Sequence, residues 1–129
     1  MFIDPFLKPG MITRTTPLIV FICLLFWGCE NEAVITASAA RLLYDSGNAV
    51  FLDVRTKTEY DDGHIEGSVH IPVSELPLRY QELEHRKNDQ IIVYCRSGNR
   101  SRKGTSILLE KGFNAKNMLG GFIEWNSSD

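Results

Sequence analysis

The sequence has little cysteine, little net charge and no long apolar run. Three cysteines in 129 residues are too few for the disulfide framework of a small secreted domain. A formal net charge of −2 gives no indication of a strongly basic protein that binds nucleic acid. The longest apolar run, residues 18–27, is about half of the roughly 20 residues that a membrane-spanning helix needs. His70 and His85 lack metal-ligand partner spacing, so no metal is expected.

The apolar run 18–27 fits the hydrophobic part of a secretory signal. The glycine and Cys29 that follow it resemble the lipobox of bacterial lipoproteins, in which the cysteine is lipidated and becomes the new N-terminus. We therefore expect a signal peptide at 1–28, with Met11 as a possible true start, and a short linker at 29–34. The alternative to a signal peptide is that the apolar run 18–27 forms a buried first helix or strand. The signal predicts a protein of the bacterial cell envelope, periplasmic or held at the membrane by a lipid on Cys29.

If this prediction is right, Cys95 is the only free thiol of the mature chain. Cys23 leaves with the signal and Cys29 is lipidated. In an oxidising envelope compartment a lone cysteine has no intramolecular partner for a disulfide. This favours single-thiol chemistry over dithiol redox chemistry.

The rest of the chain, 35–129, alternates strand-like and helix-like segments and shows no internal repeat. Strand signals lie at 35, 49–54, 68–72, 91–94 and 117–119. Helix signals lie at 39–43, 58–61, 74–83 and 101–111, and a terminal turn is expected over 120–125. This alternation predicts one α/β domain in which helices flank a mainly parallel sheet.

A cysteine stands at the end of the apolar segment 91–94, followed by a turn and a helix start. The segment reads Cys95-Arg96-Ser97-Gly98-Asn99-Arg100-Ser101. Backbone N–H groups of such a turn and helix start favour an anion and lower the pKa of a thiol placed there. The two arginines add cationic donors. Ligands of parallel sheets bind beyond the carboxyl ends of the strands, where both Cys95 and Asp53 fall.

Four motifs in this order resemble those of a single-domain rhodanese. They are Leu52-Asp53-Val54-Arg55, Gly63-His64-Ile65-Glu66-Gly67-Ser68, the segment from Cys95 to Ser101, and Leu119-Gly120-Gly121-Phe122. The resemblance covers nearly the whole predicted mature chain. It implies a three-layer rhodanese-like fold and a thiosulfate sulfurtransferase, in which sulfur moves from a donor to cyanide or a thiol.

The resemblance also assigns roles to residues. Cys95 is the expected catalytic residue and forms a persulfide, so no separate cofactor is needed. The substrate-binding loop comprises Arg96, Ser97, Gly98, Asn99, Arg100 and Ser101. Asp53 and Arg55 are expected to support the site, as a structural pair at the strand end more than as catalysts. The expected partners are small sulfur anions and thiol acceptors, with no nucleic acid, and a monomer is expected.

Two alternatives compete with this interpretation. The first is a persulfide carrier or anion-binding module that serves a partner protein without turnover. The second is a cysteine phosphatase, whose loop has one residue more between cysteine and arginine than the four that separate Cys95 from Arg100. A phosphatase also needs a carboxylic acid to protonate the leaving group, and this loop contains none.

Overall fold

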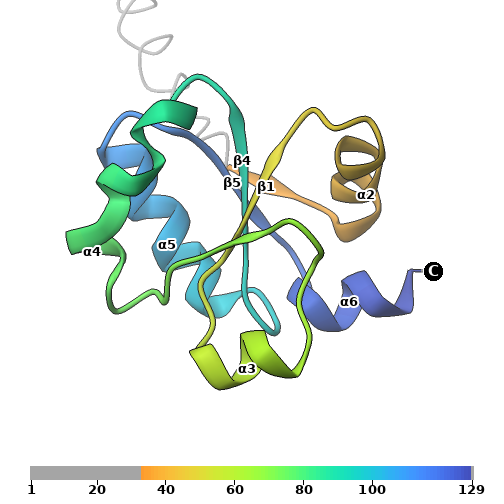
Figure 1. Cartoon of the computed structure of the whole chain (residues 1–129). Helices are drawn as coiled ribbons and strands as arrows, with labels where there is room; N and C mark the ends of the chain where they lie inside the picture. Colours follow the sequence, from red (N-terminus) through yellow and green to blue (C-terminus); the bar gives the residue numbers. More distant parts are fainter. Residues whose placement is uncertain (1–32, 129) are drawn as a thin grey trace, which may run out of the picture. The chain divides into compact units, whose positions relative to one another are not determined.

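The structure of the protein is a computed structural model that describes residues 33–128. In this part of the chain a five-stranded sheet lies between two layers of helices (Figure 1). Its strands are β1 (Val34–Ile35), β2 (Val50–Asp53), β3 (Val69–His70), β4 (Gln90–Tyr94) and β5 (Asn114–Met118). Their order across the sheet is β1-β5-β4-β2-β3, and all pairs are parallel. The predicted three-layer α/β fold is confirmed.

Helices cover both faces of the sheet. They are α2 (Ala37–Asp45), α3 (Lys57–Asp62), α4 (Leu76–Arg79), the 3₁₀ helix η1 (Tyr80–Arg86), α5 (Asn99–Glu110) and α6 (Gly121–Ser127). In Figure 1, α4 and α5 lie on one side of the sheet, α2 and α6 on the other, and α3 lies below the strand ends. None of the helices in residues 33–128 has the length and apolarity required to cross a bilayer.

Alternating side chains on the central strands build two separate cores. Leu52, Ile91 and Val93 belong to the core beneath α4 and α5. Phe51 and Ile92, one residue out of phase, belong to the core beneath α2 and α6. Because both faces are covered, β2 and β4 read as continuous apolar runs. The same alternation places Cys95 in the core beneath α4 and α5.

Short polar side chains define where two of the helices begin. The Thr36 hydroxyl accepts a hydrogen bond from the Ala39 N–H at 3.2 Å and caps α2. At α3, Thr56 and Glu59 form a reciprocal capping box: the Thr56 N–H donates to the Glu59 carboxylate at 3.0 Å, and the Glu59 N–H donates to the Thr56 hydroxyl. This box places Glu59 on the first turn of α3.

Three segments differ from the sequence prediction. The strand expected over 117–119 is β5, which begins three residues earlier, at Asn114, and ends at Met118. The helix expected over 74–83 is split into α4 and η1, and α4 has a proline in its first turn, the helical position where a missing N–H costs least. The turn expected over 120–125 is the helix α6. Gly120 (φ +72°) reverses the chain, and Trp125 then packs edge-on against Tyr44 and Phe51, with ring centroids 5.4 and 5.5 Å apart.

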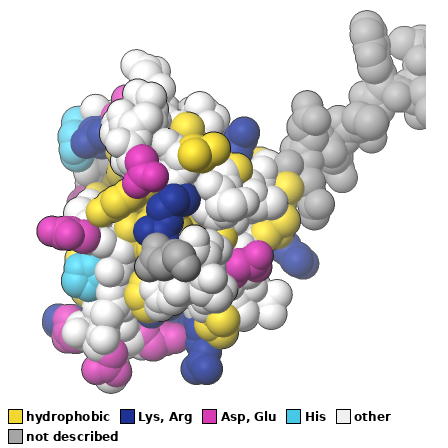
Figure 2. All heavy atoms as spheres, turned by 90° about the vertical axis from the view of Figure 1, so that its right-hand side faces the viewer, with side chains coloured by type: hydrophobic (Ala, Val, Ile, Leu, Met, Phe, Trp, Pro, Cys, Tyr) yellow, Lys and Arg dark blue, Asp and Glu magenta, His cyan; other side chains and the backbone are white. Residues whose placement is uncertain are grey.

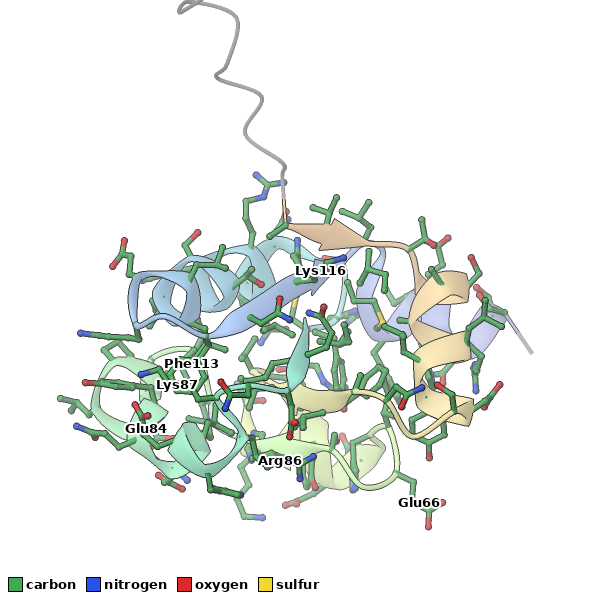
Figure 3. The ribbon with its side chains drawn as sticks, turned by 90° about the horizontal axis from the view of Figure 1, so that it is seen from above. Glu66, Glu84, Arg86, Lys87, Phe113 and Lys116 are labelled. Carbon is green, nitrogen blue, oxygen red and sulfur yellow. The ribbon has the colours of Figure 1, made fainter. Side chains whose placement is uncertain are left out.

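Two ion pairs lie at the opposite end of the sheet from α3, where Figure 3 labels Glu84, Arg86 and Lys87. Lys87 lies 3.3 Å from Glu84 and 5.2 Å from the ring centre of Phe113. Arg86 pairs with Asp89. These exposed pairs act as solvated surface contacts and not as a binding site.

Candidate active site

The carboxyl ends of β2 and β4 bring the predicted site residues together. Asp53, the last residue of β2, is in register with Tyr94, the last residue of β4. Cys95 follows Tyr94 directly and is 1% exposed. The whole segment from Cys95 to Ser101 therefore lies beside the Asp53–Arg55 segment at one end of the sheet. Cys29, the predicted lipidation site, lies outside the described residues and stays a prediction.

Hydrogen-bond donors converge on the sulfur of Cys95. The Gly98 N–H donates to Sγ at 3.1 Å, and the Ser101 hydroxyl lies 3.3 Å from Sγ. Gly98 adopts a φ of +107°, which a residue with a side chain rarely adopts, and this turn aims its N–H at the sulfur. Burial by itself would raise the pKa of the Cys95 thiol. The Ser101 hydroxyl and the backbone N–H groups of the loop outweigh burial and lower that pKa.

Ser101 shares its single hydroxyl proton between two neighbours. The Ser101 Oγ donates to Asn117 Oδ1 at 2.6 Å, and Asn117 Nδ2 donates to the Gly98 carbonyl at 3.2 Å. While the hydroxyl donates to Asn117, its oxygen can only accept a hydrogen bond from the Cys95 thiol. To stabilise the thiolate it has to turn towards Sγ and leave Asn117 Oδ1. Asn117, on β5 and 2% exposed, therefore competes with Cys95 for one proton.

This competition predicts opposite pKa changes for two substitutions. Ser101→Ala removes a donor to the thiolate and is expected to raise the pKa of Cys95. Asn117→Ala frees the hydroxyl and is expected to lower it, by about one pH unit if one hydrogen bond is gained. The measurement is the pH midpoint of Cys95 alkylation by iodoacetamide.

The double variant is the control. In a Ser101→Ala background, Asn117→Ala is expected to leave the midpoint where Ser101→Ala alone puts it. If Asn117→Ala raises the midpoint with Ser101 present, Asn117 acts by holding the Gly98 carbonyl and the competition is refuted.

The first turn of α6 holds the two carbonyls that begin the loop. The Phe122 N–H donates to the Cys95 carbonyl at 2.8 Å, and the Ile123 N–H donates to the Arg96 carbonyl at 3.1 Å. These N–H groups have no partner within their own helix, because they belong to its first turn. The contact requires the backbone at Gly121 to approach both carbonyls closely.

Asp53 and Arg55 form a buried ion pair. Arg55 Nη2 lies 2.6 Å from Asp53 Oδ2, and the side chains are 5% and 0% exposed. The same nitrogen donates to the Gly63 carbonyl at 2.7 Å, and the guanidinium stacks on Phe122, 4.4 Å from its ring centre. Burial opposes the charge of Arg55, but the Asp53 carboxylate outweighs it and raises the pKa of Arg55. The pair ties the end of β2 to the turn after α3 and to α6, which is the structural role expected.

Arg100 is engaged by an acidic residue of α3. Its guanidinium donates to both oxygens of Glu59, at 2.7 and 2.8 Å. Arg100 and burial act in opposite directions on Glu59, and the arginine prevails, lowering the pKa of Glu59 from 4.5 to about 2. The carboxylate is therefore ionised throughout the neutral range. The side chain of Arg96, by contrast, is exposed and forms no hydrogen bond or ion pair with any other described residue.

Sequence reasoning missed three residues of this site. Gly121 stands inside a recognised motif and Glu59 lies between two of them, but their contacts with the loop are not visible in the sequence. Asn117 was read only as part of a strand. Side chains alternate along a strand, so Asn117 shares a face of β5 with the buried Ala115, and a polar residue on a buried face is the one signal that singles it out. Among residues 33–128, no group of three or more potential ligands is placed to hold a metal ion.

The described residues form a parallel α/β domain with a buried thiol, which a loop N–H and a serine hydroxyl approach. The chain belongs to the rhodanese-like domain family, which matches residues 36–128. It is thereby related to the sulfurtransferases.

Relatives and solved structures agree on the family. A tRNA uridine(34) hydroxylase of Yersinia pestis is 31% identical over 96 residues, which are 70% of this chain and 27% of that protein. This chain thus spans little more than a quarter of that relative's length. A human single-domain sulfurtransferase has a TM-score of 0.66 at 29% identity, covering 75% of this chain and 97% of that one. A rhodanese-related protein of Thermoplasma volcanium has a TM-score of 0.66 at 32% identity, covering 74% and 91%.

Proposed function

We propose that the protein is a thiosulfate-type sulfurtransferase that works through a persulfide on Cys95. The observation that carries this proposal is the buried Cys95 sulfur, which receives the Gly98 N–H at 3.1 Å and has a lowered pKa. A lowered pKa increases the share of the thiolate, which is the nucleophilic form of cysteine. Arg96, exposed and unpaired among the described residues, is available to a donor oxyanion.

The reaction divides into two sulfur transfers. The Cys95 thiolate attacks the outer sulfur of thiosulfate, the sulfur–sulfur bond of the donor breaks, and sulfite leaves with the electron pair. The new persulfide anion is then stabilised by the N–H groups of the loop. An acceptor nucleophile, cyanide or a thiolate, attacks the outer sulfur, and the Cys95 thiolate is regenerated. Neither transfer needs a proton, which agrees with a loop that contains no acid or base.

The Arg100–Glu59 pair changes the role expected for Arg100, which the sequence placed in the substrate-binding loop. The bidentate pair uses two of the five N–H donors of Arg100 and neutralises its charge, which weakens its attraction for an anionic substrate. We therefore assign anion binding to Arg96 and the loop N–H groups. Arg100 acts as a positioning residue that anchors the start of α5 to α3.

The test is thiocyanate formation from thiosulfate and cyanide by the full chain. Cys95→Ser is expected to abolish turnover and the uptake of one sulfur atom, seen by mass spectrometry. Cys29→Ser, which removes a thiol but leaves the Cys95 loop intact, is the matched control and is expected to retain the activity.

The outcomes separate the alternatives. Uptake of one sulfur on Cys95 without turnover would identify a carrier that serves a partner protein. A wild-type protein that takes up no sulfur from thiosulfate would contradict the proposal.

Location and partners belong to the same proposal. The apolar run before Cys29 supports a lipid anchor and a place in the bacterial cell envelope, as a monomer. The relative from Yersinia pestis is named for the hydroxylation of a tRNA uridine, but the net charge of −2 offers no basic surface for RNA. We therefore take small sulfur anions and thiols, and not nucleic acid, as the partners of this chain.

A further inference from the structure

A cavity of about 270 Å³ opens between α3 and α6, next to the Cys95 loop. It shares two residues with the loop environment: Arg96, which follows Cys95, and Glu59, which binds Arg100. Its apolar wall is formed by Phe122 and Ile123. This volume admits a small organic molecule but no folded segment of a protein.

Most charges around this cavity cancel in pairs. Arg55 is neutralised by Asp53, and Glu59 by Arg100. The charges of Asp62 and Arg96 then remain.

Asp62 and Arg96 line the cavity, and the side chain of neither forms a hydrogen bond or ion pair with another residue of 33–128. Both are exposed to solvent. Figure 2 shows acidic, basic and apolar side chains next to one another at its lower end, the end of the molecule that carries α3. The cavity therefore offers one free carboxylate, one free guanidinium and an apolar wall.

We propose that this cavity binds the sulfur acceptor, and that the acceptor is a zwitterionic thiol of the amino-acid or short-peptide class. The Asp62 carboxylate receives the acceptor's ammonium group, and the Arg96 guanidinium receives its carboxylate. This inference rests on the proposed sulfurtransferase function. Asp62 is then a specificity-determining residue of the second sulfur transfer.

The transfer is balanced without a further reactant. The acceptor thiolate attacks the outer sulfur of the Cys95 persulfide, and a new sulfur–sulfur bond forms on the acceptor. The sulfur–sulfur bond of the persulfide breaks, and its electron pair returns to Cys95 Sγ. The outer sulfur stands one bond beyond the buried Sγ, so it is the atom that an acceptor beside the loop meets first.

The experiment measures the discharge of a preformed Cys95 persulfide in the full chain by four small thiols. Cysteine carries both charges, cysteamine only the ammonium, 3-mercaptopropionate only the carboxylate, and 2-mercaptoethanol neither. Preloading removes donor binding from the measurement. For each thiol the second-order rate constant of Asp62→Asn is divided by that of the wild type, so the intrinsic reactivities of the thiols cancel.

Asp62→Asn is expected to slow discharge by cysteine and cysteamine about fivefold, the equivalent of one exposed charge pair of about 1 kcal/mol. Discharge by 2-mercaptoethanol is expected to stay unchanged. Asp61→Asn is the matched control, because Asp61 pairs with Lys57 at 2.9 Å and does not line the cavity. It is expected to affect none of the four thiols.

Three results would overturn the inference. Equal effects of Asp62→Asn on all four thiols, or no effect on any, would refute the role of Asp62 while leaving the sulfurtransferase intact, provided that cyanide still discharges the persulfide. If Asp61→Asn slows discharge as much as Asp62→Asn, the effect comes from the lost negative charge in general and not from binding in the cavity, which refutes the inference. A protein that never forms the persulfide would remove the proposed function, and this inference with it.

Discussion

Asp53→Ala is expected to lower the free energy of unfolding by about 3–5 kcal/mol, because it leaves a charge buried without its partner. Arg55 is 4% exposed, and three of its hydrogen bonds end on the Asp53 carboxylate, at 2.6–3.0 Å. Without that carboxylate, the Gly63 carbonyl and the ring of Phe122 are the groups left around the guanidinium. A loss of this size is a large part of the stability of a small domain. Urea unfolding followed by circular dichroism measures it.

Two further variants make the result specific to the buried charge. Lys57→Ala breaks the Lys57–Asp61 pair, whose side chains are 78% and 55% exposed, and is expected to cost about 0.5 kcal/mol or less. Replacing both Asp53 and Arg55 by apolar residues is expected to recover part of the lost stability. A cost for Asp53→Ala no greater than that for Lys57→Ala would show that the pair is not buried as described.

Gly121→Ala is expected to damage both the stability and the chemistry of the site. A Cβ at Gly121 would lie 2.5 Å from the carbonyl oxygens of Cys95 and Arg96, far inside van der Waals contact. The residue also has a φ of +57°. Overpacking of this kind costs about 1–3 kcal/mol, and the positive φ adds about 1–2 kcal/mol for a residue with a side chain.

The activity is expected to fall further than the stability alone accounts for. To escape the clash, α6 or the loop has to move, and the loop carries the thiolate and its donors. A displacement approaching 1 Å lowers a rate by about 100-fold. The measurement is thiocyanate formation by the fraction of protein that remains folded.

Gly47→Ala is the matched control for Gly121→Ala. Gly47 has a φ of +70°, yet a Cβ there would meet nothing within 4 Å. It bears the backbone strain without the clash, so its effect on activity is expected to be negligible. Equal losses in the two variants would contradict a role for the close approach between α6 and the loop.

The sequence predicted two of the central strands, β2 and β4, closely and other elements less well. The apolar runs 49–54 and 91–94 became β2 and β4 with ends shifted by only one residue, because strands buried on both faces leave a continuous apolar record. The segment 120–125 was expected to be a turn, since two adjacent glycines usually interrupt a helix. Packing of Trp125 against Tyr44 and Phe51, distant in sequence, stabilises a helix there.

The site divides in the same way. The low pKa of Cys95 was predicted, because the turn that supplies its N–H donors is contiguous in sequence with it. The contacts of that turn with Glu59 and Asn117 were not, since they join residues 41 and 16 positions apart. No local pattern shows which arginine will be paired and which will be free.

The sequence by itself determined that this chain forms a parallel α/β domain and presents one cysteine in an anion-binding turn at a strand end. Strand burial, glycine turns and helix starts are set by neighbouring residues, so they can be read locally. Only the tertiary structure decided that Arg100 is held by Glu59, that Asn117 competes for the Ser101 proton, and that Arg96 and Asp62 remain free beside a cavity. Those outcomes depend on which side chains distant segments bring within hydrogen-bonding distance, and the packing of α3, β5 and α6 around the loop sets that.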